Sequence, residues 1–186
     1  MEKKINIVAI SGSLRQKSSN TALMNAIIGM APETMEFTIY GGLNDLPHFN
    51  PDMDTEEGPD SVGKLRRQLS EADGVLICTP EYGNGVPGVL KNALDWLVSS
   101  VVFMNKPTAV ISASPTPMGG DKAHASLLLT LHMINATIVE GGTLIIPHIN
   151  LKLSQDGSIT HPETKQELLA VLGELEKSVG ASKNEG

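Results

Sequence analysis

The sequence has little cysteine, few aromatic residues and no long hydrophobic run. One cysteine in 186 residues excludes an internal disulfide framework and is typical of a reducing compartment, so we expect a cytoplasmic protein. Aromatic residues make up only 3%, which argues against the stacking surfaces that bind nucleic-acid bases. No apolar run approaches the roughly 18 residues of a membrane span, and the short apolar stretch after Asn6 is too short for a signal peptide. We therefore expect no membrane partner.

Positive charge is also scarce. The chain has 14 Lys and Arg against 21 Asp and Glu, a net charge of −7 at pH 7. Because affinity for nucleic acid comes mostly from Lys and Arg on phosphates, we expect no nucleic-acid partner. The five histidines show none of the spacings of a metal centre, so we also expect no metal site. These exclusions leave a protein that acts on something small.

Apolar strand segments alternate with helical segments along the chain. The strand candidates are residues 5–10, 35–40, 74–79 and 107–113, and a last strand broken between 137–140 and 143–146. The helix candidates are residues 20–30, 60–70, 87–101, 122–134 and 162–178. This alternation predicts an α/β fold, a doubly wound five-stranded parallel sheet of order 2-1-3-4-5 with helices on both faces. We expect one domain over residues 1–178 and a frayed tail at 179–186.

Two hydrophobic residues have alternative interpretations. Trp96 lies beside the apolar stripe of the helix expected over residues 87–101, where it would suit either a subunit interface or the monomer core. Cys78 ends a buried strand, a position typical of an inert core thiol rather than a nucleophile.

Three loops are the candidate sites, because ligands of doubly wound sheets bind beyond the carboxyl ends of the strands. The first loop, residues 11–21, combines hydroxyl and amide side chains with two cations at the start of a helix. Backbone N–H groups at a helix N-terminus together with hydroxyl donors favour a phosphate site, and a simple helix cap is the alternative. The first loop carries neither the dinucleotide-binding glycine fingerprint nor a P-loop.

The other two loops are rich in glycine and proline. The second loop, residues 79–88, has three glycines and two prolines, and the third loop, residues 112–120, places small hydroxylated residues before a glycine pair. Glycine lets backbone approach a flat ligand closely, and proline holds a loop rigid. Each loop could be a simple turn, but three such loops at one sheet edge favour a binding site.

Two motifs resemble the NADPH-dependent FMN reductase family. They are Gly12-Ser13-Leu14-Arg15, followed by Ser18 and Asn20, and Thr79-Pro80-Glu81-Tyr82, followed by VPGVLKNALDW at residues 86–96. The resemblance extends from the first strand to the Gly119-Gly120 pair. It implies a flavodoxin-like fold, non-covalently bound FMN, and a homodimer or homotetramer.

The resemblance also implies which residues hold FMN. The residues that would bind its phosphate are Ser11, Ser13, Arg15, Ser18, Asn20 and Thr21. The residues that would lie along the isoalloxazine ring, mainly through backbone groups, are Pro80, Glu81, Tyr82, Gly83 and Asn84, with Ser112, Gly119 and Gly120 at its border. The second loop departs from the family pattern at Gly83 and Gly85, which flank Asn84.

The activity implied by the resemblance is an NAD(P)H oxidoreductase, with NADPH or NADH as the co-substrate. Hydride would pass through bound FMN to a small-molecule acceptor: a quinone, an azo compound, a metal oxyanion or free flavin. The cofactor carries this chemistry, so we assign no catalytic side chain. The alternative is a flavodoxin-type electron carrier without nicotinamide turnover, although such carriers cover the ring with aromatics and the sequence places only Tyr82 near the site. A phospho-acceptor receiver is excluded, because the first and third strands do not end in acids.

Overall fold

The computed structural model of the protein describes residues 4–56 and 58–184. Its strands are β1 (Ile5–Ser11), β2 (Met35–Tyr40), β3 (Gly74–Thr79), β4 (Pro107–Ala113) and β5 (Thr137–Ile146). Its α-helices are α1 (Ser19–Gly29), α2 (Asp60–Glu71), α3 (Gly88–Asp95), α4 (Asp121–Met133) and α5 (Pro162–Asn184). Short 3₁₀ helices are η1 (Gly42–Asp45), η2 (Pro51–Met53) and η3 (Ile149–Leu151). The strands form one parallel sheet of order β2-β1-β3-β4-β5, which confirms the predicted fold class.

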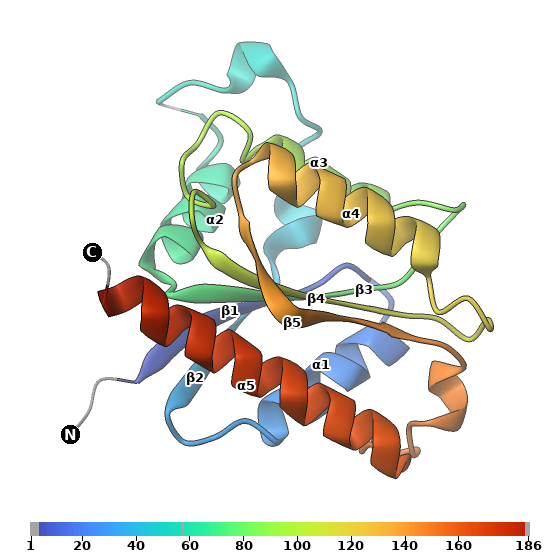
Figure 1. Ribbon diagram of the computed structural model, residues 1–186. Helices are drawn as coiled ribbons and strands as arrows, with labels where there is room; N and C mark the ends of the chain where they lie inside the picture. Colours follow the sequence, from blue (N-terminus) through green and yellow to red (C-terminus); the bar gives the residue numbers. More distant parts are fainter. Residues whose placement is uncertain (1–3, 57, 185–186) are drawn as a thin grey trace.

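The sheet lies between two helical layers, with α2, α3 and α4 on one face and α1 and α5 on the other (Figure 1). Successive side chains of a strand point to opposite faces, so each strand contributes to two cores. In β3, Ile77 packs with the α2–α3–α4 layer and Leu76 with the α1–α5 layer. Every residue of β3 is buried, which explains its continuous apolar sequence.

The carboxyl ends of β1 and β3 meet closely. The Gly12 N–H donates a hydrogen bond of 2.8 Å to the Cys78 carbonyl as the first loop leaves β1. A Cβ atom at Gly12 would lie 2.7 Å from the Thr79 hydroxyl oxygen, too close for any larger residue. Glycine at this position therefore lets the first loop cross the end of β3 and reach the second loop.

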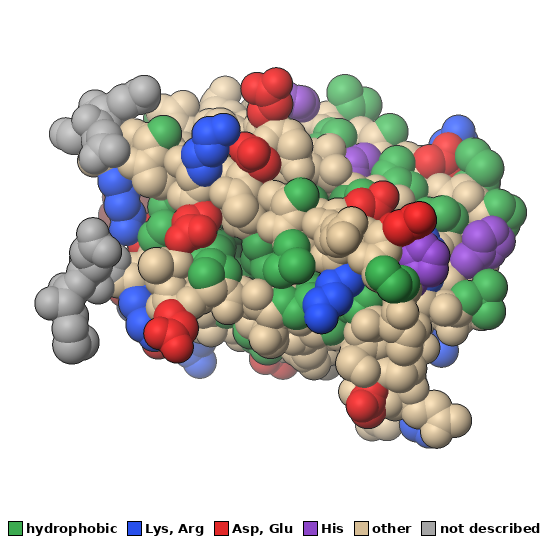
Figure 2. Space-filling view, turned by 60° about the horizontal axis from the view of Figure 1, so that its bottom comes forward, with side chains coloured by type: hydrophobic (Ala, Val, Ile, Leu, Met, Phe, Trp, Pro, Cys, Tyr) green, Lys and Arg blue, Asp and Glu red, His purple; other side chains and the backbone are tan. Residues whose placement is uncertain are grey.

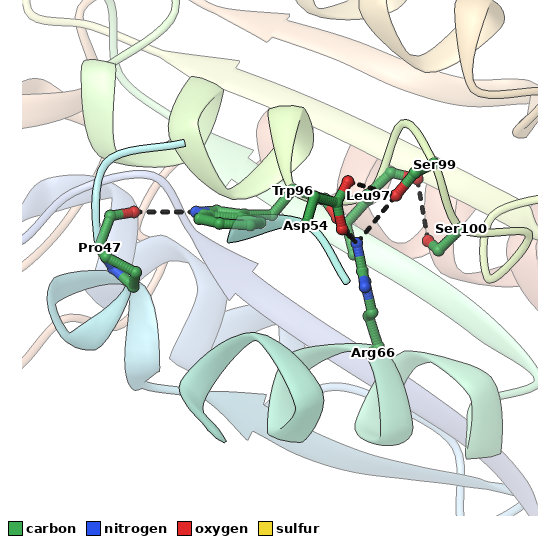
Figure 3. Close-up of polar contacts among 7 residues, drawn as sticks. All are labelled: Pro47, Asp54, Arg66, Trp96, Leu97, Ser99 and Ser100. Carbon is green, nitrogen blue, oxygen red and sulfur yellow. Dashed lines mark hydrogen bonds and ion pairs between the residues drawn. The ribbon is translucent and has the colours of Figure 1, made fainter. Parts of the chain in front are cut away.

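Helix α3 ends earlier than predicted, at Asp95 rather than at residue 101. The Leu97 and Val98 N–H groups donate to the Leu94 and Asp95 carbonyls, three residues back instead of four. The Trp96 carbonyl accepts a 2.5 Å hydrogen bond from the Arg66 guanidinium (Figure 3). Because the Leu97 and Val98 N–H groups bind carbonyls three residues back, the chain leaves the helix in a series of turns. Val98, which the apolar stripe placed inside, is 46% exposed.

Trp96 belongs to the monomer core. Its side chain is fully buried, and its indole Nε1–H donates a 2.8 Å hydrogen bond to the Pro47 carbonyl (Figure 3). The Phe49 ring packs edge-to-face against it, with ring centroids 5.1 Å apart. Of the two interpretations of Trp96, the structure selects the core over the subunit interface.

Helix α5 runs further than predicted, so the expected frayed tail is wrong for residues 179–184; residues 185–186 lie outside the described part. Val179 is 1% exposed and joins the α1–α5 core, and the Lys183 ammonium forms a 2.8 Å ion pair with Asp73. The remaining boundaries agree with the prediction to within one residue. The break expected in the last strand appears as a shift in the β4–β5 register between Thr108 and Val110.

Two surface properties bear on partners. Figure 2 shows acidic and basic side chains interspersed on one face of the molecule, with no concentration of positive charge. In residues 4–56 and 58–184, no helix combines the length and apolarity needed to cross a membrane.

Candidate functional site

The first loop places hydroxyl groups around the N-terminus of α1. The Ser18 hydroxyl caps the helix by accepting a 3.3 Å hydrogen bond from the Thr21 N–H. The Thr21 hydroxyl lies 2.8 Å from that of Ser11, so these residues form one cluster. Capping the helix requires only Ser18 and does not explain the other hydroxyl groups of the cluster. Because the positive end of the helix dipole lies beside them, the cluster is suited to bind an anion.

Ser13 and Arg15 extend the hydroxyl cluster toward solvent. Ser13 is 8% exposed, and its hydroxyl accepts a 3.3 Å hydrogen bond from the Arg15 N–H. The Arg15 side chain is exposed, which allows its guanidinium to reach an anion in front of the loop. Beside the loop, a cavity of about 580 Å³ is lined by Lys17, Ser18 and Thr21 and, on its other side, by residues 153–157.

Asn20 links the first loop to the end of β4. Its side-chain N–H₂ donates a 3.0 Å hydrogen bond to the Ala113 carbonyl, and the residue is 4% exposed. Within the described residues, its Oδ1 atom and the hydroxyl of Ser112 are buried without a hydrogen-bond partner. Leaving such an atom unpaired costs about 1–3 kcal/mol. The hydroxyl donors fit the phosphate of FMN, whereas the Asn20 Oδ1 atom is an acceptor and fits an N–H or O–H group of the cofactor.

The second loop forms a tight hairpin turn. Tyr82 and Gly85 exchange two backbone hydrogen bonds of 3.1 Å, and the two residues between them, Gly83 and Asn84, have φ angles of 56° and 59°. Positive φ at both central positions defines a type I′ turn, which glycine and asparagine adopt most readily. The turn fixes Tyr82, whose hydroxyl lies 3.1 Å from that of Ser13 and so joins the second loop to the first.

The third loop rests on the end of β5. Gly119 has a φ of 64°, and a Cβ atom there would lie 2.6 Å from Ile145 Cγ2. The Ser114 N–H donates to the Ile146 carbonyl, and the His148 N–H donates to the Thr116 carbonyl, both at 3.2 Å. These contacts hold the Gly119-Gly120 pair at the edge where the other loops lie.

The Glu81 side chain joins the second and third loops. Its Oε2 atom accepts hydrogen bonds of 2.9 Å from the Lys122 N–H and 3.0 Å from the Ala123 N–H, at the start of α4. A Cβ atom on Gly120 would lie 3.5 Å from Glu81 Cβ and 3.6 Å from Ser112 Cβ. The structure therefore brings together residues predicted from separate parts of the sequence.

Some residues that shape this edge were absent from the predicted site. Gly12 belongs to the first motif and was expected to form a tight turn, but its close approach to Thr79 at the end of β3 was not predicted. Ala113 contributes only a carbonyl, and Lys122 and Ala123 contribute only N–H groups. Nearly every residue type carries these backbone groups, so the sequence does not indicate which positions use them.

Burial shifts the pKa of two titratable groups near the sheet toward their neutral forms. Burial raises the pKa of the Cys78 thiol to about 12, in agreement with an inert core cysteine. Burial also lowers the pKa of His124, which is 6% exposed on α4. Among the described residues, no group of three or more His, Cys, Asp or Glu side chains is placed to hold a metal ion.

Comparison with known proteins agrees with this geometry. The family described as NADPH-dependent FMN reductase matches residues 5–150. The quinone reductase of Escherichia coli strain K12 is 35% identical over 142 residues, covering 75% of this chain and 76% of that protein. The 2-hydroxy-1,4-benzoquinone reductase of Burkholderia sp is 31% identical over 167 residues, covering 88% and 90%. The solved structure of FerB, a flavoenzyme NAD(P)H:(acceptor) oxidoreductase from Paracoccus denitrificans, has a TM-score of 0.75 and 30% identity, covering 95% of this chain and 96% of that one.

A doubly wound sheet of this strand order, with a hydroxyl-rich loop after β1, defines a flavodoxin-like protein. The chain belongs to the NADPH-dependent FMN reductase family, and it is an FMN-dependent NAD(P)H oxidoreductase. The predicted family, fold, enzyme class and cofactors are thus confirmed. The relatives are named as reductases, which supports the enzyme over the electron carrier.

Proposed function

We propose that FMN binds across the three loops and that the protein passes hydride from NAD(P)H to a quinone. The observation that carries this proposal is the cross-linking of the loops at one edge. Ser13 contacts Tyr82, Asn20 binds the Ala113 carbonyl, and Glu81 binds the start of α4. A site whose walls are held together in this way needs little rearrangement to bind a rigid, flat cofactor.

The first loop is the proposed phosphate site. Its residues are those expected from the sequence: Ser11, Ser13, Arg15, Ser18, Asn20 and Thr21. The first N–H groups of α1 and the surrounding hydroxyls donate hydrogen bonds, and the Arg15 guanidinium adds charge. Because these donors all lie in the first loop and α1, they bind the phosphate of the cofactor without help from the residues along the ring.

The second and third loops are the proposed walls of the ring. Their residues are Pro80, Glu81, Tyr82, Gly83, Asn84, Ser112, Gly119 and Gly120. Bound FMN supplies the hydride chemistry, and the protein binds and orients it. Tyr82 and Met118, which are 46% and 58% exposed, supply apolar surface beside this edge. That surface suits a planar, partly apolar acceptor.

A quinone is the acceptor that we place first, because curated relatives covering most of the chain are named for quinone reduction. An azo compound, a metal oxyanion or free flavin would use the same surface and are the other acceptors to test. The acceptor is a small molecule in each case, and the proposal includes neither a nucleic-acid nor a membrane partner.

We further propose that the protein is a single domain that works in the cytoplasm as a homodimer or homotetramer. Large apolar side chains remain exposed on α4 and on the connection before β4, among them Val101 at 70%, Met104 at 50% and Leu129 at 72%. Exposed apolar side chains of this size are typical of surfaces that another protein covers when they form one patch, and we propose that these do.

The test is quinone-dependent oxidation of NADPH and of NADH by protein incubated with FMN and then desalted. We expect flavin to stay with the protein and nicotinamide oxidation to depend on both flavin and quinone. Flavin that is retained without any nicotinamide oxidation, whichever acceptor class is offered, would overturn the proposed function. Light scattering of the same sample measures the oligomeric state.

A further inference from the structure

Helix α4 begins without a cap of its own. The residue before its first turn is Gly120, which has no side chain and adopts a φ of 87°. The first N–H groups of a helix have no partner within the helix and need acceptors from elsewhere. A serine or aspartate at this position would be strained, because side-chain residues rarely adopt that φ.

Glu81 supplies the missing acceptor from another loop. Its carboxylate binds the Lys122 and Ala123 N–H groups, the second and third residues of α4, although it lies 41 and 42 positions away in the sequence. These are the N–H groups that a capping side chain normally binds. The carboxylate also places negative charge at the positive end of the helix dipole.

The backbone of Glu81 lies in the second loop. Pro80 before it is buried, and Tyr82 after it contacts Ser13 in the first loop. A Cβ atom on Gly120 would lie 3.5 Å from Glu81 Cβ and 3.8 Å from Glu81 N, so the two loops are in contact here. One residue thus has its backbone in one wall of the site and its carboxylate in the other.

We propose that Glu81 is a positioning residue for flavin: its carboxylate caps α4 and so fixes the third loop against the second before the cofactor binds. The proposal rests on the assignment of these loops as the flavin site. It gives the Glu81 side chain a role different from direct contact with the ring. Without this carboxylate, the first N–H groups of α4 lose their acceptor, the first turn of the helix loosens, and the third loop moves away from the second.

The test compares Glu81→Ala with Glu81→Gln, and uses Glu163→Ala, an exposed glutamate in the first turn of α5, as the matched control. Two quantities are measured: amide hydrogen exchange at Lys122 and Ala123 in flavin-free protein, and the Kd for FMN from flavin fluorescence. For Glu81→Ala we expect the exchange rate and the Kd each to rise about tenfold, the effect of losing a good helix cap. Glu81→Gln keeps an oxygen that accepts both N–H groups, so we expect changes below about threefold. The control should change neither quantity.

Unchanged exchange at Lys122 and Ala123 in Glu81→Ala would overturn the proposal. So would a Glu81→Gln variant that loses FMN as strongly as Glu81→Ala while exchange in α4 stays normal, since charge would then act on flavin directly. If Glu81→Ala does not fold, Glu81→Asp replaces it. Its carboxylate is one methylene shorter and cannot reach both N–H groups, so we expect the same rise in exchange and in the Kd, and unchanged exchange would overturn the proposal. Wild-type protein that binds no FMN would overturn the flavin site itself, and the exchange measurement would report the capping separately.

Discussion

The hydroxyl groups of Ser13 and Tyr82 lie 3.1 Å apart, although the residues are 69 positions apart in the sequence. Ser13 belongs to the loop proposed for phosphate, and Tyr82 belongs to the wall proposed for the ring. The contact sets the spacing between the two parts of the flavin site. Its removal should therefore weaken binding of the whole cofactor.

We predict that Tyr82→Phe raises the Kd for FMN about fivefold, the usual effect of one lost neutral hydrogen bond. In a Ser13→Ala background, the same substitution should have little further effect, because the partner is already absent. Tyr40→Phe, at the end of β2, is the control. Equal effects of Tyr82→Phe in both backgrounds would show that the two hydroxyls act independently.

Arg15 should recognise the phosphate and not the ring. Arg15→Ala should raise the Kd for FMN by about 10–100-fold, because it removes a charge-assisted hydrogen bond, and should leave the Kd for riboflavin unchanged. Arg67→Ala, at an exposed position on α2, changes the net charge equally and serves as the control. An equal loss of FMN and riboflavin binding would place Arg15 against the ring.

The glycines of the third loop should be intolerant of substitution. We predict that Gly119→Ala lowers the free energy of unfolding by about 2–3 kcal/mol or more, because it combines a positive φ with contacts of 2.6 Å to Ile145 Cγ2 and 2.9 Å to Pro147 N. Gly63 provides the contrast, since it lies in α2 with nothing within 4 Å of an added Cβ. Gly63→Ala should raise the free energy of unfolding by about 0.5–1 kcal/mol. Urea denaturation measures both, and a Gly119→Ala variant as stable as wild type would contradict the loop geometry.

Asp54 should make stability depend on pH. A hydrogen bond from Ser99 is the main cause that lowers the pKa of its carboxyl below the ordinary 3.8; desolvation opposes it, and the hydrogen bond and charge of Arg66 lower the pKa further (Figure 3). The unfolded chain thus binds this proton more readily, so the stabilisation is complete above the ordinary pKa and is lost as the pH falls through the lower folded value. The stability difference between wild type and Asp54→Asn should be largest near neutral pH and shrink on acidification. A difference that stays constant below pH 3.8 would refute the assignment.

The sequence predicted the sheet well because its strands are buried on both faces. The buried segments of β3 and β4, rich in β-branched and apolar residues, have few other interpretations, and their alternation with helices leaves few topologies. The end of α5 was also present in the sequence, since Val179 follows Leu175 at helical spacing. The end of α3 was not, because the turns after Asp95 keep the apolar spacing of a helix, and their contact with Arg66, 30 residues away, exists only in the folded chain.

The candidate site was predicted only in part for the same reason. Motifs identified the residues of the three loops, but not the pairing of Ser13 with Tyr82 or of Glu81 with α4. These pairings join backbone or side-chain groups across 41 to 69 residues and depend on the folded edge of the sheet. Position in the fold, rather than residue type, decides which glutamate caps which helix.

The most direct test of the account is the visible spectrum of FMN-loaded, desalted protein titrated with NADPH and with NADH in the absence of oxygen. We predict that the absorbance of the retained flavin is lost on addition of at least one nicotinamide and returns when a quinone is added. Retained flavin that neither nicotinamide reduces would contradict it and would instead identify an electron carrier.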